Sequence, residues 1–342
     1  MKLSHTERIK ATLQGKQVDR LPYSFWTHFP TIDLDPYKLA NATYEFCKEF
    51  EVDFIKNMPN GMYMAEAWSC ECDYSHIRQG GVAKVTKFAI DREDDWCNLK
   101  QLDVTSGPLG RELKSLDYLV KKVNNDRPVI FTIFSPLTTA SKICNSIQPY
   151  IENSPDALKE GLQTITEVTI RFAKEALKRG CAGVFFANQL ASELYMTEKQ
   201  YSEFGRPYDL KCLNAIKNDS WFNVMHLHGE KILFDKVKDY PVQAINWHIW
   251  DSPPTVEHFF QETDKVIVGG LQRSLITKCD VENLKTQIKE ISKKCNKLKL
   301  ILSPDCVIRY PVHREAITGT KDQIISLTES KDTSEVLHKP HH

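Results

Sequence analysis

Short apolar runs alternate with long amphipathic segments along almost the whole chain. The runs are rich in β-branched or aromatic residues and largely apolar throughout, as expected for parallel strands that are covered on both faces. The eight predicted strands are residues 21–26, 53–58, 128–134, 183–188, 222–227, 242–247, 265–270 and 298–303. Helical periodicity between them is clearest over residues 36–50, 156–179, 198–217 and 281–295.

This alternation favours an α/β fold, a single (β/α)8 TIM barrel, over an open doubly wound sheet. A dinucleotide-binding sheet needs a glycine-rich turn after its first strand, whereas LPYSFWTHFP contains no glycine. Residues 69–127 are predicted to be an insertion after the second strand, with a hairpin in GGVAKVTKFAI and a helix over GPLGRELKSLDYLVKKV. The predicted barrel domain spans residues 1–330, and residues 331–342 form a C-terminal tail.

The charge balance and the hydropathy pattern argue against several kinds of partner. The 45 basic residues are matched by 45 acidic residues, which gives no basic surface for nucleic acid or for a membrane. The start, MKLSHTERIKATLQGK, lacks the apolar core of a signal peptide, and no window reaches the roughly 18 apolar residues of a membrane span. The 10 cysteines are scattered, which favours reduced thiols. We therefore expect a cytoplasmic protein that acts on a small molecule, of unknown oligomeric state.

Polar side chains follow the predicted strands, at the end of the barrel where active sites lie. In strand order they are His28; Asn57 and Asn60; Ser135 and Pro136; Asn188 and Gln189; His226 and His228; Trp247 and His248; Gln272 and Arg273; and Asp305 and Cys306. If the barrel forms, these residues converge on one pocket.

Three of these residues are good ligands for zinc. His226 and His228 are two positions apart, so they can share one face of a strand, and Cys306 reaches the same mouth from the eighth strand. Zinc takes about four nitrogen or sulfur donors, and a catalytic zinc keeps one position open. A purely structural interpretation stays open as well, because histidines at strand ends often bond loop carbonyls and a lone cysteine is often a small buried hydrophobe.

Several segments together resemble the uroporphyrinogen decarboxylase superfamily, and the similarity covers nearly the whole chain. They are ERIKATLQGKQVDRLPYSFW, FSPLTTASKI, ALKRGCAGVFFANQ, NVMHLHGEKILF, YPVQAINWH, VIVGGL and LILSPDCVI. The resemblance implies a (β/α)8 barrel and one of two chemistries. One branch decarboxylates uroporphyrinogen III without a cofactor, and the other consists of zinc methyltransferases that move a methyl group from a methylated corrinoid protein to a thiol such as coenzyme M.

The decarboxylase branch matches this sequence poorly at its active site. Its members carry an arginine-rich motif after the first strand to hold the substrate carboxylates, whereas residues 25–30 contain no arginine. They also place an aspartate after the second strand, where this chain has Asn57 or Asn60.

The methyltransferase branch matches better. Its members hold zinc on a His-x-Cys pair after strand five and on a cysteine in a Pro-Gly-Cys context after strand eight. Here the corresponding residues are His226-Leu227-His228 and Pro304-Asp305-Cys306, so the middle cysteine is a histidine. The resemblance thus implies zinc on His226, His228 and Cys306, and a corrinoid carried by a partner protein.

The remaining predicted site residues are taken from the strand ends. Catalytic or ligand-orienting roles fall to His28, His248 and Asp305, and His248 or Asp305 could also be a further zinc ligand. The predicted cofactor contacts are Asn57, Asn188, Gln189 and Trp247.

Two alternatives and the direction of methyl transfer stay open. One alternative is a cofactor-free lyase or decarboxylase acting on a small acid, in which His226, His228 and His28 transfer protons and Lys56 or Arg273 pairs with the carboxylate. The other is a non-catalytic binder of a tetrapyrrole or corrinoid.

Overall fold

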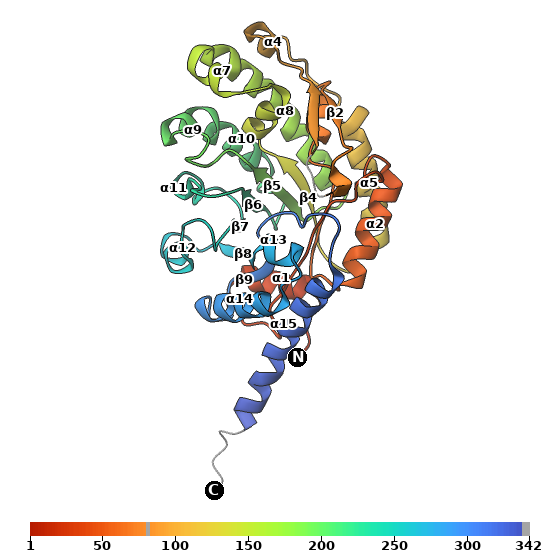
Figure 1. The fold of residues 1–342 in the computed structure, drawn as a ribbon, viewed down its shortest axis with the longest axis vertical. Coiled ribbons are helices and arrows are strands. Elements are labelled where there is room, and N and C mark those ends of the chain that lie inside the picture. The colour runs from red at the N-terminus through yellow and green to blue at the C-terminus, as the bar shows by residue number, and fades with distance from the viewer. Residues whose placement is uncertain (80–82, 337–342) are drawn as a thin grey trace.

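The protein has an α/β fold built on one curled sheet of seven parallel strands (Figure 1). The computed structural model describes residues 1–79 and 83–336. Neighbouring strands follow the order β1-β4-β5-β6-β7-β8-β9. They are β1 Ile55–Lys56, β4 Val129–Phe134, β5 Gly183–Asn188, β6 Val224–Leu227, β7 Ala244–Asn246, β8 Val266–Leu271 and β9 Leu300–Pro304. All of their residues are buried, which explains the continuous apolar runs in the sequence.

The predicted first strand, residues 21–26, is not a strand of this sheet. The segment makes isolated parallel bridges instead, Tyr23 with Leu302 and Thr27 with Ile308. Its backbone bonds in both directions, because the Ser24 amide donates to the Leu302 carbonyl over 2.9 Å and the Asp53 amide donates to the Tyr23 carbonyl over 2.8 Å. The segment therefore lies between β9 and the start of β1. Pro22 has no amide hydrogen to extend a ladder, which shortens the pairing.

Helices cover the outside of the curled sheet (Figure 1). They are α1 His5–Leu13, α2 Pro36–Glu49, α3 Tyr63–Ala67, α4 Glu93–Cys97, α5 Gly107–Val123, α6 Pro136–Ile143, α7 Gln148–Asn153, α8 Pro155–Lys178, α9 Glu198–Phe204, α10 Arg206–Ile216, α11 Phe234–Val237, α12 Val256–Glu262, α13 Arg273–Thr277, α14 Val281–Lys294 and α15 Arg314–Val336, with a 3-10 turn η1 at Ile77–Gln79. The single helix predicted over residues 198–217 is in fact two, α9 and α10. They meet at Gly205, and Pro207 in the first turn of α10 cannot donate the amide bond that would continue α9.

The inserted region contains a small antiparallel pair, β2 Glu71–Asp73 with β3 Lys84–Lys87. The sequence predicted a hairpin with both strands within residues 80–90. In the structure the partner of β3 is β2, which comes earlier in the chain. Residues 80–82 lie outside the described residues. The predicted tail at 331–342 begins inside α15, which continues to Val336, and residues 337–342 also lie outside the described residues.

All 10 cysteines are free thiols. In the described part of the chain, no helix combines the length and the apolar character that crossing a bilayer requires.

A buried carboxylate ties the N-terminus to the sheet. Asp53, whose side chain is 0% exposed, accepts hydrogen bonds from the guanidinium groups of Arg8 on α1 and Arg20, at 2.7 and 2.8 Å. It also accepts from the Tyr23 amide at 2.9 Å and contacts Nδ1 of His5 at 2.8 Å. Burial alone raises the pKa of Asp53, but His5, Arg20 and Arg8 outweigh it and hold this pKa below its ordinary value.

Candidate metal centre and active-site cavity

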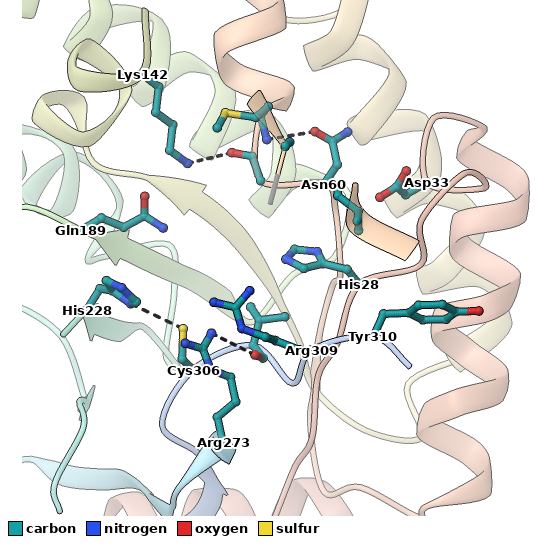
Figure 2. Close-up of a pocket in the computed structure, with 15 residues that line it drawn as sticks. His28, Asp33, Asn60, Lys142, Gln189, His228, Arg273, Cys306, Arg309 and Tyr310 are labelled. Atoms are coloured by element: carbon teal, nitrogen blue, oxygen red, sulfur yellow. Dashed lines mark hydrogen bonds between the residues drawn. The ribbon is translucent and has the colours of Figure 1, made fainter. Parts of the chain in front are cut away.

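A cavity of about 350 Å³ opens at the carboxyl ends of the strands. This position is where side chains from successive parallel strands meet in folds of this class. Figure 2 shows the side chains that line it, among them His28, Asn60, Lys142, Gln189, His228, Arg273 and Cys306. Of the predicted strand-end residues, those that line this cavity are His28, Asn60, Gln189, His228, Arg273 and Cys306.

Two histidines and a cysteine form a compact cluster at this cavity. His226 is the third residue of β6, His228 follows the strand, and Cys306 lies just after β9. Their ligand atoms all lie within 4.8 Å of one another, and the Cys306 Sγ atom is 3.5 Å from Nδ1 of His228. Because β7 and β8 separate β6 from β9, the curl of the sheet brings these donors together.

The imidazole of His226 is held in one orientation and one tautomer. Its Nδ1 lies 2.5 Å from Oδ1 of Asn246 on β7. The amide nitrogen of Asn246 donates to the carbonyls of Val268 and Pro304, at 2.8 and 3.1 Å, so Oδ1 must be the acceptor from His226. The proton of His226 is therefore on Nδ1, and Nε2 keeps a lone pair for a cation.

His248 and Asp305 extend the cluster on one side. Nδ1 of His248 is 3.4 Å from Oδ2 of Asp305, and the His248 ring packs edge-on against His228 with 5.3 Å between ring centroids. The Nε2 atom of His248 is buried and has no hydrogen-bond partner among the described residues. Such an atom is costly unless a hydrogen-bond partner or a metal satisfies it.

The electrostatics of the cluster favour a thiolate at Cys306 and, through burial that lowers its pKa, a neutral imidazole at His226. Burial alone raises the pKa of the Cys306 thiol, but His226, His228 and His248 outweigh it and hold this pKa well below its ordinary value. Burial, with the charge of Lys56, lowers the pKa of His28 to about 4. Deprotonated sulfur and unprotonated imidazole nitrogen are the forms that bind a borderline-soft cation.

The predicted cofactor contacts do not all reach the cavity. Gln189 lines it. Asn57 instead accepts a 2.6 Å hydrogen bond from the amide of Thr132, which joins β1 to β4. Trp247 stacks on Phe259 of α12, with 5.0 Å between centroids, and so packs against the helical layer. Its chain neighbour His248 instead packs against His228, with 5.3 Å between ring centroids.

Asn188 belongs to a buried polar network away from the cavity. Its Nδ2 atom donates to the hydroxyl of Tyr201 at 2.8 Å and lies 3.3 Å from Oδ2 of Asp209. The hydroxyls of Tyr201 and Tyr240 donate to the same carboxylate oxygen at 2.5 and 2.7 Å. Burial raises the pKa of Asp209 to about 7, although these donors oppose the shift.

This pKa gives an expected pH dependence of stability. In the folded state Asp209 keeps its proton up to about pH 7, whereas in the unfolded chain it loses the proton near the ordinary aspartate pKa of 3.8. The contribution of Asp209 to the free energy of unfolding should therefore fall as the pH rises between these two values. The loss is on the order of 1.4 kcal/mol for each pH unit in which the two states differ by a full proton. Urea unfolding at pH 5 and pH 8 measures it. In the Asp209→Asn variant, the free energy of unfolding should differ less between pH 5 and pH 8. An unchanged difference would contradict the role given to Asp209.

Several cavity residues were not predicted from the sequence. Lys142 on α6, Asp33 in the loop before α2, and Arg309 and Tyr310 after β9 all line the cavity. None of them directly follows a strand, so inspecting strand ends passes over them. A lysine inside the otherwise uncharged and mostly buried segment PLTTASKI was the available signal for Lys142.

Comparison with known proteins places the chain in a family. The family model for uroporphyrinogen decarboxylase (URO-D) matches residues 4–319. The methylcobamide:CoM methyltransferase MtbA of Methanosarcina mazei is 21% identical over 237 residues, which cover 65% of this chain and 69% of that protein. Its namesake from Methanosarcina acetivorans is 19% identical over the same length and the same shares of both chains.

Solved structures agree on the fold. A methyltransferase from Methanosarcina mazei superimposes with a TM-score of 0.83 at 17% identity, covering 95% of this chain and 99% of its own. A B12-independent methionine synthase from a Shewanella species gives a TM-score of 0.58 at 12% identity, covering 94% and 95%. Since the family model spans nearly the whole length, the chain belongs to the uroporphyrinogen decarboxylase (URO-D) family.

Proposed function

We propose that the protein is a zinc-dependent methyltransferase that moves a methyl group between a corrinoid, carried by a partner protein, and a small molecule such as a thiol. The observation that carries this proposal is the cluster of His226, His228 and Cys306 within 4.8 Å at the mouth of the cavity. The names of both curated relatives, methylcobamide:CoM methyltransferase, support the reaction class.

The same proposal includes the architecture. Residues 1–330 form a single (β/α)8 barrel in which the segment around Tyr23 takes the place of the eighth strand. Its backbone bonds to Leu302 on one side and to Asp53 on the other support this arrangement. The cavity then sits at the catalytic end of the barrel.

The residues present suit a zinc ion. His226, His228 and Cys306 would hold it, and the unpartnered Nε2 of His248 makes this histidine the candidate for a fourth ligand. When bound, zinc would lower the pKa of a thiol and keep its thiolate available near neutral pH. With His228 in place of the middle cysteine of the family's zinc enzymes, the donor set is less electron-rich, which bears on the choice of acceptor.

The surrounding residues position the donors and the substrate. Asp305 lies against His248, and its Oδ1 accepts a 2.9 Å bond from the Arg273 amide, so the carboxylate is fixed. His28 contacts the Pro59 carbonyl through Nδ1 at 3.1 Å, which leaves Nε2 as an acceptor for a molecule in the cavity. The cavity volume of about 350 Å³ is at the low end for ligand sites and suits a small molecule better than a whole tetrapyrrole.

Metal analysis of protein that carries no added histidine tag tests the proposal. We expect about one zinc per chain and zinc-dependent demethylation of methylcobalamin by a thiol, followed by absorbance. Metal-free protein that decarboxylates a small acid would instead support the lyase alternative. An absorbance change with a corrinoid but no turnover would support the binder.

The orientation of His226 gives a separate expected result. Asn246→Ala removes the acceptor that fixes the His226 tautomer, so the affinity for zinc should fall by about 10- to 100-fold, as for other partners of metal-bound histidines. Competition with a chromophoric chelator measures this affinity. A folded Asn246→Ala variant with unchanged zinc affinity would show that His226 is not a ligand.

A further inference from the structure

The cavity wall contains a lysine that has no carboxylate partner. The Nζ atom of Lys142 donates to the Gly61 carbonyl at 2.7 Å and lies 3.5 Å from the centroid of the Phe134 ring. Lys142 forms no ion pair with any side chain that the structure describes. Burial lowers the pKa of Lys142 to about 7. An ammonium group has three donors, so Lys142 retains hydrogen-bonding capacity for an acceptor in the cavity.

A carboxyl group and an unpartnered amide share the same cavity. Asp33 is 4% exposed, lines the cavity, and forms no ion pair with the described side chains. The neighbouring cation Arg111 lies against Glu66 and Glu112 instead, at 3.4 and 3.6 Å. Asn60 is 1% exposed and also lines the cavity, and its Nδ2 atom has no partner among the described residues.

These groups are separated in space. Figure 2 shows Lys142 and Asp33 on different sides of the cavity, with Cys306 and His228 below Lys142. An ammonium and a carboxyl that lined one cavity could neutralise each other by pairing, but here they do not. Each buried charge is costly without a partner, so a ligand that supplies both opposite charges stabilises both residues.

We propose that the cavity binds a small zwitterion, with its acidic group on Lys142, its ammonium group on Asp33 and its reactive end at the cluster of His226, His228 and Cys306. The reactive end is a thiol if the proposed function holds, and the acceptor is then an amino-acid thiol. The two charged subsites do not depend on that function, because they are defined by Lys142 and Asp33 alone.

Calorimetric binding to the full-length, zinc-loaded protein at pH 7 tests this proposal with four thiols. They are L-homocysteine, which is a zwitterion, 3-mercaptopropionate and 2-mercaptoethanesulfonate, which are anions, and cysteamine, which is a cation. L-Homocysteine should bind at least about tenfold more tightly than the other three, because charged hydrogen bonds contribute this much individually. L-Homoserine, which lacks sulfur, tests the charged subsites in protein stripped of metal, and we expect measurable binding.

Two variants separate the subsites. Lys142→Met should weaken the binding of L-homocysteine and of 3-mercaptopropionate by about tenfold or more, and it should leave the binding of cysteamine unchanged. Asp33→Asn should weaken the binding of L-homocysteine and of cysteamine, and it should leave the binding of 3-mercaptopropionate unchanged. Lys174→Met, an exposed lysine on α8, is the matched control and should change none of them.

The outcomes keep the two proposals apart. Equal affinity for 2-mercaptoethanesulfonate and L-homocysteine, with no effect of Asp33→Asn, would overturn the zwitterion and leave the zinc site intact. Protein that takes up no zinc when zinc is supplied, but still binds L-homoserine through Lys142 and Asp33, would overturn the proposed function and leave the zwitterion subsites intact.

Discussion

Cys306→Ala is expected to remove zinc from the protein and to lower methyl transfer by about a thousandfold or more. Cys306 is the sulfur donor of the cluster, and the thiolate is stabilised there by His226, His228 and His248. Loss of a group that merely orients a zinc ligand costs 10- to 100-fold, so loss of a direct ligand should cost more. Zinc per chain by plasma emission, and methylcobalamin demethylation with a thiol, measure the two effects.

Cys295→Ala is the matched control for this experiment. Cys295 is also a buried free thiol, but it follows α14 and does not line the cavity. This variant should keep both its zinc and its activity. If Cys306→Ala retains about one zinc per chain in a folded protein, the metal centre is not the one assigned here.

Asp53→Ala is expected to lower the free energy of unfolding by about 3–5 kcal/mol. Breaking a buried ion pair by removing one partner is strongly destabilising, and Arg8, whose side chain is 3% exposed, would keep only Asp19 as an acidic partner. The same carboxylate also joins Arg20 and the Tyr23 amide, so its loss loosens the segment that lies between β9 and β1. Urea unfolding at pH 7 measures the change.

Asp117→Ala is the control for surface charge. Asp117 pairs with Arg179, but its side chain is 47% exposed, so the expected loss in the free energy of unfolding is within about 1 kcal/mol.

Because the pKa of Asp53 is lowered in the folded state, its contribution to stability is present at neutral pH and is lost as the solution is acidified below the unfolded pKa. An Asp53→Ala protein as stable as Asp117→Ala would contradict this account.

The sequence predicts the strands well because most of them are buried on both faces. Residues 183–188 were predicted as a strand and form β5 with the same bounds. His226, His228 and Cys306 could be brought together from the sequence because carboxyl ends of parallel strands share one end of a barrel. The sequence could not show that Asn188 faces Tyr201 while Gln189 faces the cavity, because this depends on where each strand stops pairing.

The places of Lys142 and Asp33 in the cavity could not be predicted from the sequence for a different reason. Their places on the cavity wall are set by how α6 and the loop before α2 pack over the sheet, which is tertiary information. The break between α9 and α10 at Gly205 could have been predicted, because Pro207 is visible in the sequence and a proline at that position ends the preceding helix.

The candidate metal donors and the proposed charged subsites of the cavity come from different halves of the chain. His226 lies on β6, and His228 and Cys306 follow β6 and β9. The proposed charged subsites are Asp33 and Lys142, both of which precede β5. Changes in the first half can therefore alter which molecule is recognised without touching the donors that would hold a metal. A division of this kind lets one reaction be adapted to new substrates by mutation or by exchange of half-barrels, with the reactive centre inherited intact.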